Sequence, residues 1–228
     1  MKRTISVLLT LVMCLSIFAS LGTTATAGLL DASGQMQDTS SEDNGTIYWE
    51  LSGTTLTISG DGYMPNGTDQ CWTSALAGRK LTKLVIEEGV KSIMEGAFYG
   101  EDKLKSVTLP DSLEFIGDSA FADTAIAFVT LPKNLQSFNG TIFNSQSFTQ
   151  YNVSPENPYF KSVDGVVYSK DLTKLVAYPI GRFAEGGKNN FKIPETVTEI
   201  SSYAFLNCQH TYIHRYSVFQ KFFHIFHL

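Results

Sequence analysis

Apolar residues recur with one fixed spacing in four separate segments of the chain. In each segment the apolar residues follow one another at successive offsets of 4, 3 and 5 residues. The four sets are Ile86, Val90, Ile93 and Phe98; Leu109, Leu113, Ile116 and Phe121; Leu131, Leu135, Phe138 and Phe143; and Ile193, Val197, Ile200 and Phe205. The last position is phenylalanine in every set, and a proline follows the first position in three of them. Because only 43% of the residues are hydrophobic, this agreement indicates a true structural repeat.

The first positions of the sets also give the length of the repeat. Those at 86, 109 and 131 are 23 and 22 residues apart, but the next set begins at 193. A further strand fits into this gap, because the apolar residues of 148–153 have the same spacing as those of 104–109. We therefore expect repeat units whose first positions are 86, 109, 131, 153 and 193, with an insertion in the fourth unit.

A period of 22 or 23 residues predicts a leucine-rich-repeat solenoid. Each unit supplies one short strand, turns after its proline and returns through a segment that ends in phenylalanine. One unit alone cannot bury its apolar residues, so the units stack and their strands pair in parallel. We predict a mainly β fold with short helical or irregular returns, in which the four matching phenylalanines form one continuous internal column.

Two stretches, LKSVTLPDSLEFIGDSAFADT and KIPETVTEISSYAFLNC, resemble the BspA-type leucine-rich repeat of bacterial surface proteins. The resemblance covers about residues 46–208. The repeat of that family ends in a cysteine, but only Cys208 fills this position here, and Glu101 and Thr124 occupy it in earlier units. Asn139 likewise replaces a glycine of the first stretch. The resemblance implies an exported, non-enzymatic protein that adheres to host matrix proteins or to other cells.

The N-terminus is predicted to direct export. Residues 1–27 have the layout of a signal peptide, with Lys2 and Arg3 before an apolar stretch and small residues before a cleavage site at Gly28. A membrane anchor is the alternative, but polar residues interrupt the apolar stretch. Residues 28–45 are typical of a flexible leader, and no second long apolar run follows. We expect a secreted or cell-surface protein with no membrane span after cleavage.

Two hairpins are predicted beside the regular units. Residues 46–80 contain the first, and we interpret this region as an N-terminal cap over the open end of the solenoid. The repeats are expected over 81–208, with the second hairpin as an insertion at 155–182. The aromatic residues of this insertion are Tyr159, Phe160, Tyr168 and Tyr178. We expect them to lie in the core, and a sugar-binding surface is the alternative.

The last segment, residues 209–228, departs from the repeat. All four histidines of the chain lie here, among aromatic residues and without an acidic residue. Metal binding by these histidines, with or without Cys208, is disfavoured because their spacing matches no established zinc pattern. A C-terminal cap is one alternative. The preferred interpretation is an end that is truncated or shifted in reading frame.

Composition and charge exclude several classes of function. A net charge of −5 argues against a nucleic-acid-binding protein. No histidine precedes His210, so the repeat units lack the base that a serine or cysteine triad needs. The carboxylates near strand ends are Glu87, Glu88, Asp111 and Glu195, and we expect them to form a solvated stripe rather than a catalytic pair. We therefore expect the protein to have no enzymatic activity, no cofactor and no bound metal. We also expect Cys71 and Cys208 to be two separate thiols rather than a disulfide.

The candidate binding surface follows from the alternation of side chains along each strand. Residues beside the inward-pointing apolar positions face outward. The candidate ligand-binding residues are Lys83, Ser106, Thr108, Phe128, Thr130, Gln150, Asn190 and Lys192. Five strands at about 4.8 Å spacing would form a ribbon roughly 20 Å long, with Phe128 as its aromatic anchor unless a local register shift buries that ring. We expect the partner to be an extracellular protein of the host matrix or a cell surface, and the alternative function is an accessory polysaccharide-binding module.

Overall fold

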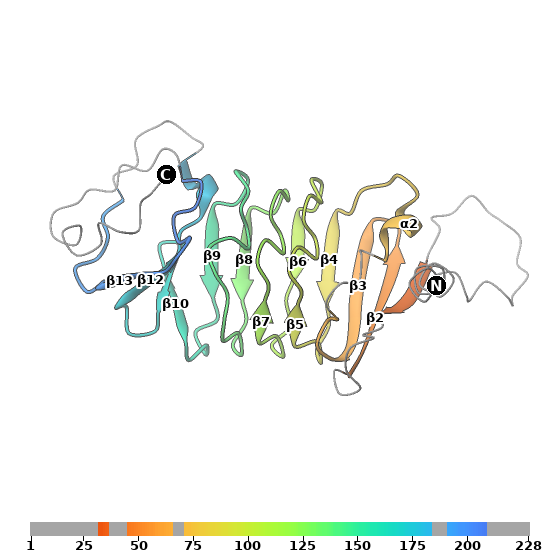
Figure 1. Cartoon of the computed structure of the whole chain (residues 1–228), viewed down its shortest axis with the longest axis horizontal. Helices are drawn as coiled ribbons and strands as arrows, with labels where there is room; N and C mark the ends of the chain where they lie inside the picture. Colours follow the sequence, from red (N-terminus) through yellow and green to blue (C-terminus); the bar gives the residue numbers. More distant parts are fainter. Residues whose placement is uncertain (1–31, 37–44, 66–70, 184–190, 209–228) are drawn as a thin grey trace, which may run out of the picture.

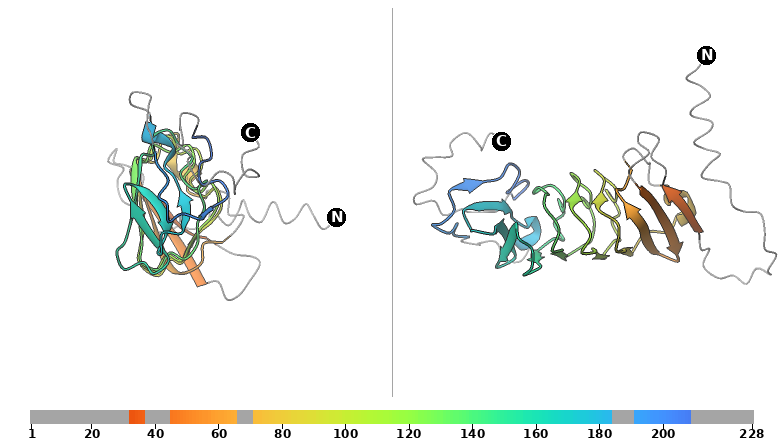
Figure 2. Two further views of the ribbon diagram at one scale, coloured as in Figure 1. Left: turned by 90° about the vertical axis from the view of Figure 1, so that its left-hand side faces the viewer. Right: turned by 90° about the horizontal axis from the view of Figure 1, so that it is seen from below.

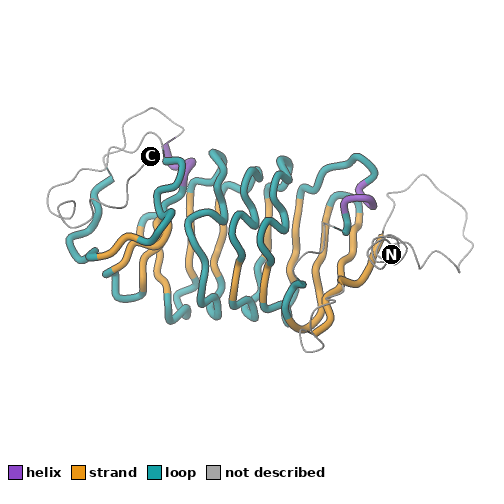
Figure 3. Tube along the Cα trace, in the orientation of Figure 1, coloured by secondary structure: helices purple, strands orange, loops and turns teal. Residues whose placement is uncertain are grey.

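The computed structural model describes residues 32–36, 45–65, 71–183 and 191–208. These residues form an elongated coil in which the elements follow one another along the long axis (Figure 1). The strands are β1 (Ala32–Met36), β2 (Gly45–Ser52), β3 (Thr55–Gly62), β4 (Lys83–Ile86), β5 (Ser92–Ile93), β6 (Ser106–Thr108), β7 (Phe115–Ile116), β8 (Phe128–Leu131), β9 (Gln150–Val153), β10 (Phe160–Val163), β11 (Val166–Ser169), β12 (Lys174–Ala177) and β13 (Glu199–Ile200). The helical elements are α2 (Thr73–Leu76) and the 3-10 turn η1 (Ile180–Phe183). The predicted mainly β solenoid with irregular returns is therefore confirmed (Figure 3).

The first strands of the units pair in parallel within two separate groups. β3, β4 and β6 lie side by side, as do β8 and β9. Leu84 lies opposite Val107, and Val129 lies opposite Tyr151, so equivalent positions of successive units are neighbours. Seen along the long axis, the units superimpose on one outline (Figure 2). Because side chains alternate along a strand, this register sends one set of residues inward and the other outward in every unit.

Two further ladders join the units on their other sides. β5 and β7 pair in parallel, with Ile93 opposite Ile116. On the return segment, the Phe98 amide donates to the Ala120 carbonyl at 2.8 Å, and the Phe121 amide donates to the Ile142 carbonyl at 2.9 Å. The irregular returns therefore have their buried backbone groups satisfied by the neighbouring units, which allows a coil with so few residues in strands to stay closed.

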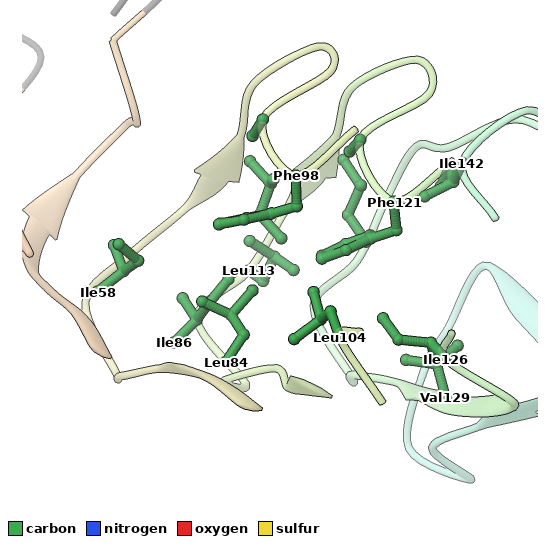
Figure 4. Packing of buried hydrophobic residues seen from close by; sticks show 14 of the residues in the cluster. Ile58, Leu84, Ile86, Phe98, Leu104, Leu113, Phe121, Ile126, Val129 and Ile142 are labelled. Carbon is green, nitrogen blue, oxygen red and sulfur yellow. The ribbon is translucent and has the colours of Figure 1, made fainter. Parts of the chain in front are cut away.

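The predicted aromatic column is present over three of its four members. Phe98, Phe121 and Phe143 stack with ring-centroid distances of 5.3 and 5.1 Å. Figure 4 shows the rings of Phe98 and Phe121 lying parallel, with Leu113 and Leu104 beside them. The column is longer than the sequence indicated, because Trp72 extends it at one end at 5.3 Å and Phe148 at the other at 4.4 Å. Trp72 of the cap thus fills the phenylalanine position of a unit that precedes the first recognised one.

The fourth phenylalanine of the repeat, Phe205, does not lie in this column, so that part of the prediction is wrong. Phe205 belongs to a second apolar cluster and stacks on Tyr178 at 5.2 Å. The Tyr178 amide donates to the Ala204 carbonyl at 2.9 Å, as the Phe98 amide does to Ala120. Tyr178 therefore takes the phenylalanine position in this part of the chain, and the stack begins again beyond the insertion.

The N-terminal hairpin is part of the sheet. β2 and β3 pair antiparallel, and β3 then pairs in parallel with β4, from Thr55 opposite Lys83 to Ile58 opposite Ile86. The hairpin thus covers the end of the coil by continuing its sheet. Residues 32–36, which the sequence assigns to a flexible leader, form β1 along the edge of β2. Its last residue, Met36, is buried in the core, which explains why this short polar segment is held in place.

The fourth unit leaves the regular path at Asn157. This residue occupies the position that Leu113 and Leu135 fill in earlier units, and it is fully buried. Its Nδ2 donates to the carbonyls of Pro132 and Leu135, at 2.8 and 3.0 Å, and its Oδ1 accepts from the amides of Tyr159 and Phe160, both at 2.8 Å. The side chain thereby anchors the turn into β10, where the inserted strands begin.

The inserted strands separate the two apolar clusters. β10, β11 and β12 are antiparallel, which confirms the predicted hairpin of β11 and β12, and β12 then pairs in parallel with β13. Val167 and Val176 pack into the first cluster, whereas Tyr168 and Leu175 pack into the second. In the part of the chain that the structure describes, no helix is long and apolar enough to cross a bilayer.

Candidate binding surface

The outward side chains of the first strands form two rows across neighbouring units. Lys83 lies opposite Ser106, and Val85 lies opposite Thr108. In the second pair of strands, Phe128 lies opposite Gln150, and Thr130 lies opposite Asn152. The candidate residues Lys83, Ser106, Thr108, Phe128, Thr130 and Gln150 are all exposed. We call this set, together with Val85 and Asn152, the strand face.

Phe128 keeps its outward orientation, so the alternative of a local register shift is wrong. Its side chain is 65% exposed, while the next residue, Val129, is buried in the core. On the neighbouring strand, Gln150 Nε2 donates to Asn152 Oδ1 at 2.7 Å, which fixes the two amides relative to each other. A large apolar ring therefore stands beside an ordered pair of polar side chains.

The predicted continuous ribbon of five strands is wrong, because β6 and β8 belong to separate sheets. The strand face also differs from that ribbon at both ends. Asn190 lies outside the described residues. Lys192 is exposed, but 191–193 form no strand, so the structure does not bring this lysine into the rows. At the other end, Thr55 and Thr57 of β3 continue the rows beyond Lys83 and Val85. The repeat pattern does not reveal this extension, because β3 belongs to a hairpin and lacks the proline that marks the regular units.

Two of the four carboxylates near the strand ends, Glu88 and Asp111, hold neighbouring turns together. The Glu88 carboxylate accepts from the amides of Asp111 and Ser112, at 2.8 and 3.1 Å. Asp111 in turn lies 3.2 Å from Lys133 Nζ, and this hydrogen-bonded ion pair raises the pKa of the lysine. Glu195 lies beside Lys192 at 3.8 Å. Each of these carboxylates faces a backbone amide or a lysine, an arrangement that stabilises turns.

The aromatic residues of the insertion are mostly core residues. Tyr168 and Tyr178 are buried, and burial raises the pKa of Tyr168 to about 12 and that of Tyr178 further. Phe160 is half-buried and packs edge-on against Phe138 at 5.1 Å. Tyr159 is 47% exposed. The expectation of core positions is therefore confirmed for Tyr168 and Tyr178 and is wrong for Tyr159. The two buried rings cannot line a sugar-binding surface together with Tyr159.

The described residues contain no group of three or more histidine, cysteine or acidic side chains that could hold a metal ion. The four histidines lie outside the described residues. Cys71 and Cys208 are both partly buried, and no disulfide joins them in the described part of the chain.

Comparison with protein families places this coil in a known group. The model described as "BspA type Leucine rich repeat region" matches residues 69–176 and 180–223 in six copies. The chain belongs to this family. No curated protein matches the sequence.

Solved structures of bacterial leucine-rich-repeat proteins resemble this BspA-type chain at low identity. A leucine-rich repeat protein from Eubacterium ventriosum is 22% identical over 77% of this chain, with a TM-score of 0.43. A leucine-rich cell surface protein from Faecalibacterium prausnitzii is 29% identical over 56%, with a TM-score of 0.47. The pneumococcal vaccine antigen PcpA is 20% identical over 79%, with a TM-score of 0.41. The chain spans 57%, 33% and 63% of these three proteins, respectively.

The cysteine position of the BspA-type repeat is filled by other residues in the regular units. Glu101 is only 7% exposed, and burial raises the pKa of its carboxyl, opposed by the nearby Lys80 and by a hydrogen bond from the Leu81 backbone. Thr124 is buried and its Oγ1 donates to the Phe121 carbonyl at 2.8 Å. Both polar side chains thus form hydrogen bonds at the position where the family repeat has a cysteine thiol.

Proposed function

We propose that this BspA-type chain is an exported, non-enzymatic binding protein whose strand face docks on an extracellular protein of the host matrix or a cell surface. The observation that supports this most directly is Phe128, which is 65% exposed beside the polar side chains of Gln150, Thr130 and Asn152 on the paired strands β8 and β9. A single exposed aromatic ring within a polar surface is typical of the anchor of a protein interface. Repeat proteins also commonly bind partners through surfaces built from equivalent positions.

A protein partner is preferred to a polysaccharide. Sugar-binding surfaces rely on exposed aromatic rings with polar groups beside them. In the insertion, Tyr168 and Tyr178 are buried and Tyr159 is the exposed tyrosine. An accessory polysaccharide-binding module remains the second candidate, since Gln150 and Asn152 present ordered amides beside Phe128.

Export is part of the proposal, and residues 1–27, which carry its signal, lie outside the described residues. Secretion in a bacterial host should yield a product whose first residue is Gly28, determined by N-terminal sequencing. A protein that stays in the cytoplasm with an intact N-terminus would contradict this part.

The test of the strand face compares two exposed phenylalanines. We expect Phe128→Ala to weaken binding to a responsive member of a matrix-protein panel by about tenfold or more, because an anchor ring is worth roughly 1.4 kcal/mol or more. The matched control is Phe115→Ala, since Phe115 is 44% exposed but lies on β7, outside the strand face. Binding should be measured by surface plasmon resonance beside a glycan array. Equal losses for the two variants would contradict the strand face, and binding to glycans alone would favour the second candidate.

A further inference from the structure

The strand face is divided between β6 and β8. These strands follow one another along the coil (Figure 1), but in the described part of the chain they belong to separate sheets and no ladder joins them. On their outer sides both are paired, since β6 pairs with β4 and β8 pairs with β9. The edges of β6 and β8 that face each other therefore lack a strand partner. We call this division, lined by residues 107–109 and 128–130, the seam.

The seam is confined to one side of the coil. On the other sides the same two units are joined, because Phe115 forms a parallel bridge with Ser137 and the Phe121 amide donates to the Ile142 carbonyl at 2.9 Å. The rings of Phe121 and Phe143 also stack at 5.1 Å. The two units are thus firmly packed, and only their strands on the strand face remain unpaired.

The side chains beside the seam are less buried than their equivalents. Val107 and Leu109 of the second unit are only half-buried. In the third unit the same positions are filled by Val129 and Leu131, which are 2% and 0% exposed. Part of the apolar interior is therefore accessible along the edge of β6.

The hydrogen bonds of the neighbouring units show which backbone groups face the seam. The carbonyls of Ile58 and Leu131 each accept from an amide of the following unit at 2.9 Å. Leu109 is the equivalent of both, and Val107 lies two residues before it, so the backbone groups of these two residues point toward β8. This edge of β6 thus presents amides and carbonyls of the kind that pair with a strand.

Building on the proposed function, we propose that the seam receives an extended segment of the partner protein, whose backbone pairs with the free edges of β6 and β8. The unpaired groups on both sides belong to strands, and an added strand is the ligand that satisfies them. Alternate side chains of that segment would contact the exposed ring of Phe128 and the half-buried Val107 and Leu109. We therefore expect the segment to carry apolar residues at alternate positions.

Hydrogen exchange tests the seam in the chain alone and with the responsive matrix protein. The Val107 amide is compared with those of Leu84 and Val129, which hold the same position within the two paired ladders. In the free chain we expect Val107 to exchange about tenfold faster or more, because its amide faces the seam. On binding, its exchange should slow by about tenfold or more, since the added strand supplies an acceptor.

Two results would overturn the inference. A Val107 amide as protected as that of Leu84 in the free chain would mean that the seam is a closed ladder. Binding that Phe128→Ala weakens, without slower exchange at Val107, would exclude strand addition and leave the proposed function standing. Slower exchange at Val107 with a partner whose binding does not depend on Phe128 would support the seam and contradict the proposed anchor.

Two equivalent threonines provide the second measurement. Thr108 on β6 and Thr130 on β8 turn their amides toward the preceding strand, which is β4 for Thr108 and lies across the seam for Thr130. We expect Thr108→Pro to lower the melting temperature, because it removes a ladder bond. Thr130→Pro should lower it much less, but should weaken binding of the matrix protein by about tenfold.

The threonine variants give a clear negative result as well. Equal losses of melting temperature, or a Thr130→Pro chain that does not fold, would show that the Thr130 amide is already bonded within the free chain. Unchanged binding by Thr130→Pro would show that the partner does not use this edge. Either result would overturn the inference.

Discussion

Asn157 shows how one polar residue can redirect a coil that is otherwise held by apolar contacts. Its four hydrogen bonds satisfy two carbonyls of the preceding unit and two amides of its own turn. An apolar residue at this position would fill the space but leave these backbone groups without partners. Since an unsatisfied buried group costs about 1–3 kcal/mol, the amide is the residue type that permits both burial and the turn into β10.

Asn157→Ala should therefore destabilise the protein by about 3 kcal/mol or more, because several buried backbone groups lose their partners at once. Urea unfolding followed by circular dichroism measures the loss. Asn152→Ala is the matched control, since Asn152 is half-buried and accepts one side-chain bond from Gln150. A loss for Asn157→Ala no larger than that of the control would show that the turn does not depend on these bonds.

Glu101 supplies a prediction on pH. Burial raises the pKa of this carboxyl above its ordinary value of 4.5, so the folded chain holds its proton more tightly than the unfolded chain. The stability that this residue contributes should then fall as pH rises from about 4.5 through the raised pKa. We expect Glu101→Gln, which keeps an acceptor for the Leu81 amide, to raise the melting temperature at pH 8 and to have little effect at pH 4. Equal effects at the two pH values would contradict the role of burial.

At the scale of the element, the sequence predicts those repeat units in which the same residue type fills the same position of every unit. Ile93 and Ile116 are paired as the spacing predicts, and the rings of Phe98, Phe121 and Phe143 stack in order. These positions can be predicted from a single sequence, because each unit packs against a neighbouring unit of the same shape and therefore needs the same side chains. The outward orientation of Phe128 follows from the same periodicity, but the sequence left a local register shift open and the structure excludes it.

The exceptions arise where a different residue type performs the same structural task. Trp72 replaces phenylalanine in the cap, Tyr178 replaces it beyond the insertion, and Asn157 replaces leucine in the fourth unit. A search for apolar columns at a period of 22 or 23 residues misses all three. The separation of Phe205 from the main column depends on the antiparallel return of β11 and β12, and no local sequence pattern specifies how far that return displaces the next unit.

At the scale of the whole molecule, the coil contains two apolar cores divided by one pair of strands. The opposite faces of β12 belong to different cores, because Leu175 packs with Tyr178 and Ile200, whereas Val176 packs with the main cluster. Stability in repeat proteins is approximately a sum of unit and nearest-neighbour terms, so the two cores need not unfold together. The division places the strand face on the larger core, away from the second.

Two adjacent substitutions on β12 test whether the cores are independent. Leu175→Ala should weaken the second core by about 2–5 kcal/mol, and Val176→Ala should weaken the first. Native-state hydrogen exchange reads each core separately, through the Ser201 amide bonded to Leu175 and the Phe121 amide bonded to Ile142. We expect Leu175→Ala to reduce protection at Ser201 while Phe121 stays protected. Loss of protection at both amides in either variant would mean that the coil unfolds as a single cooperative unit and that β12 transmits stability between the cores.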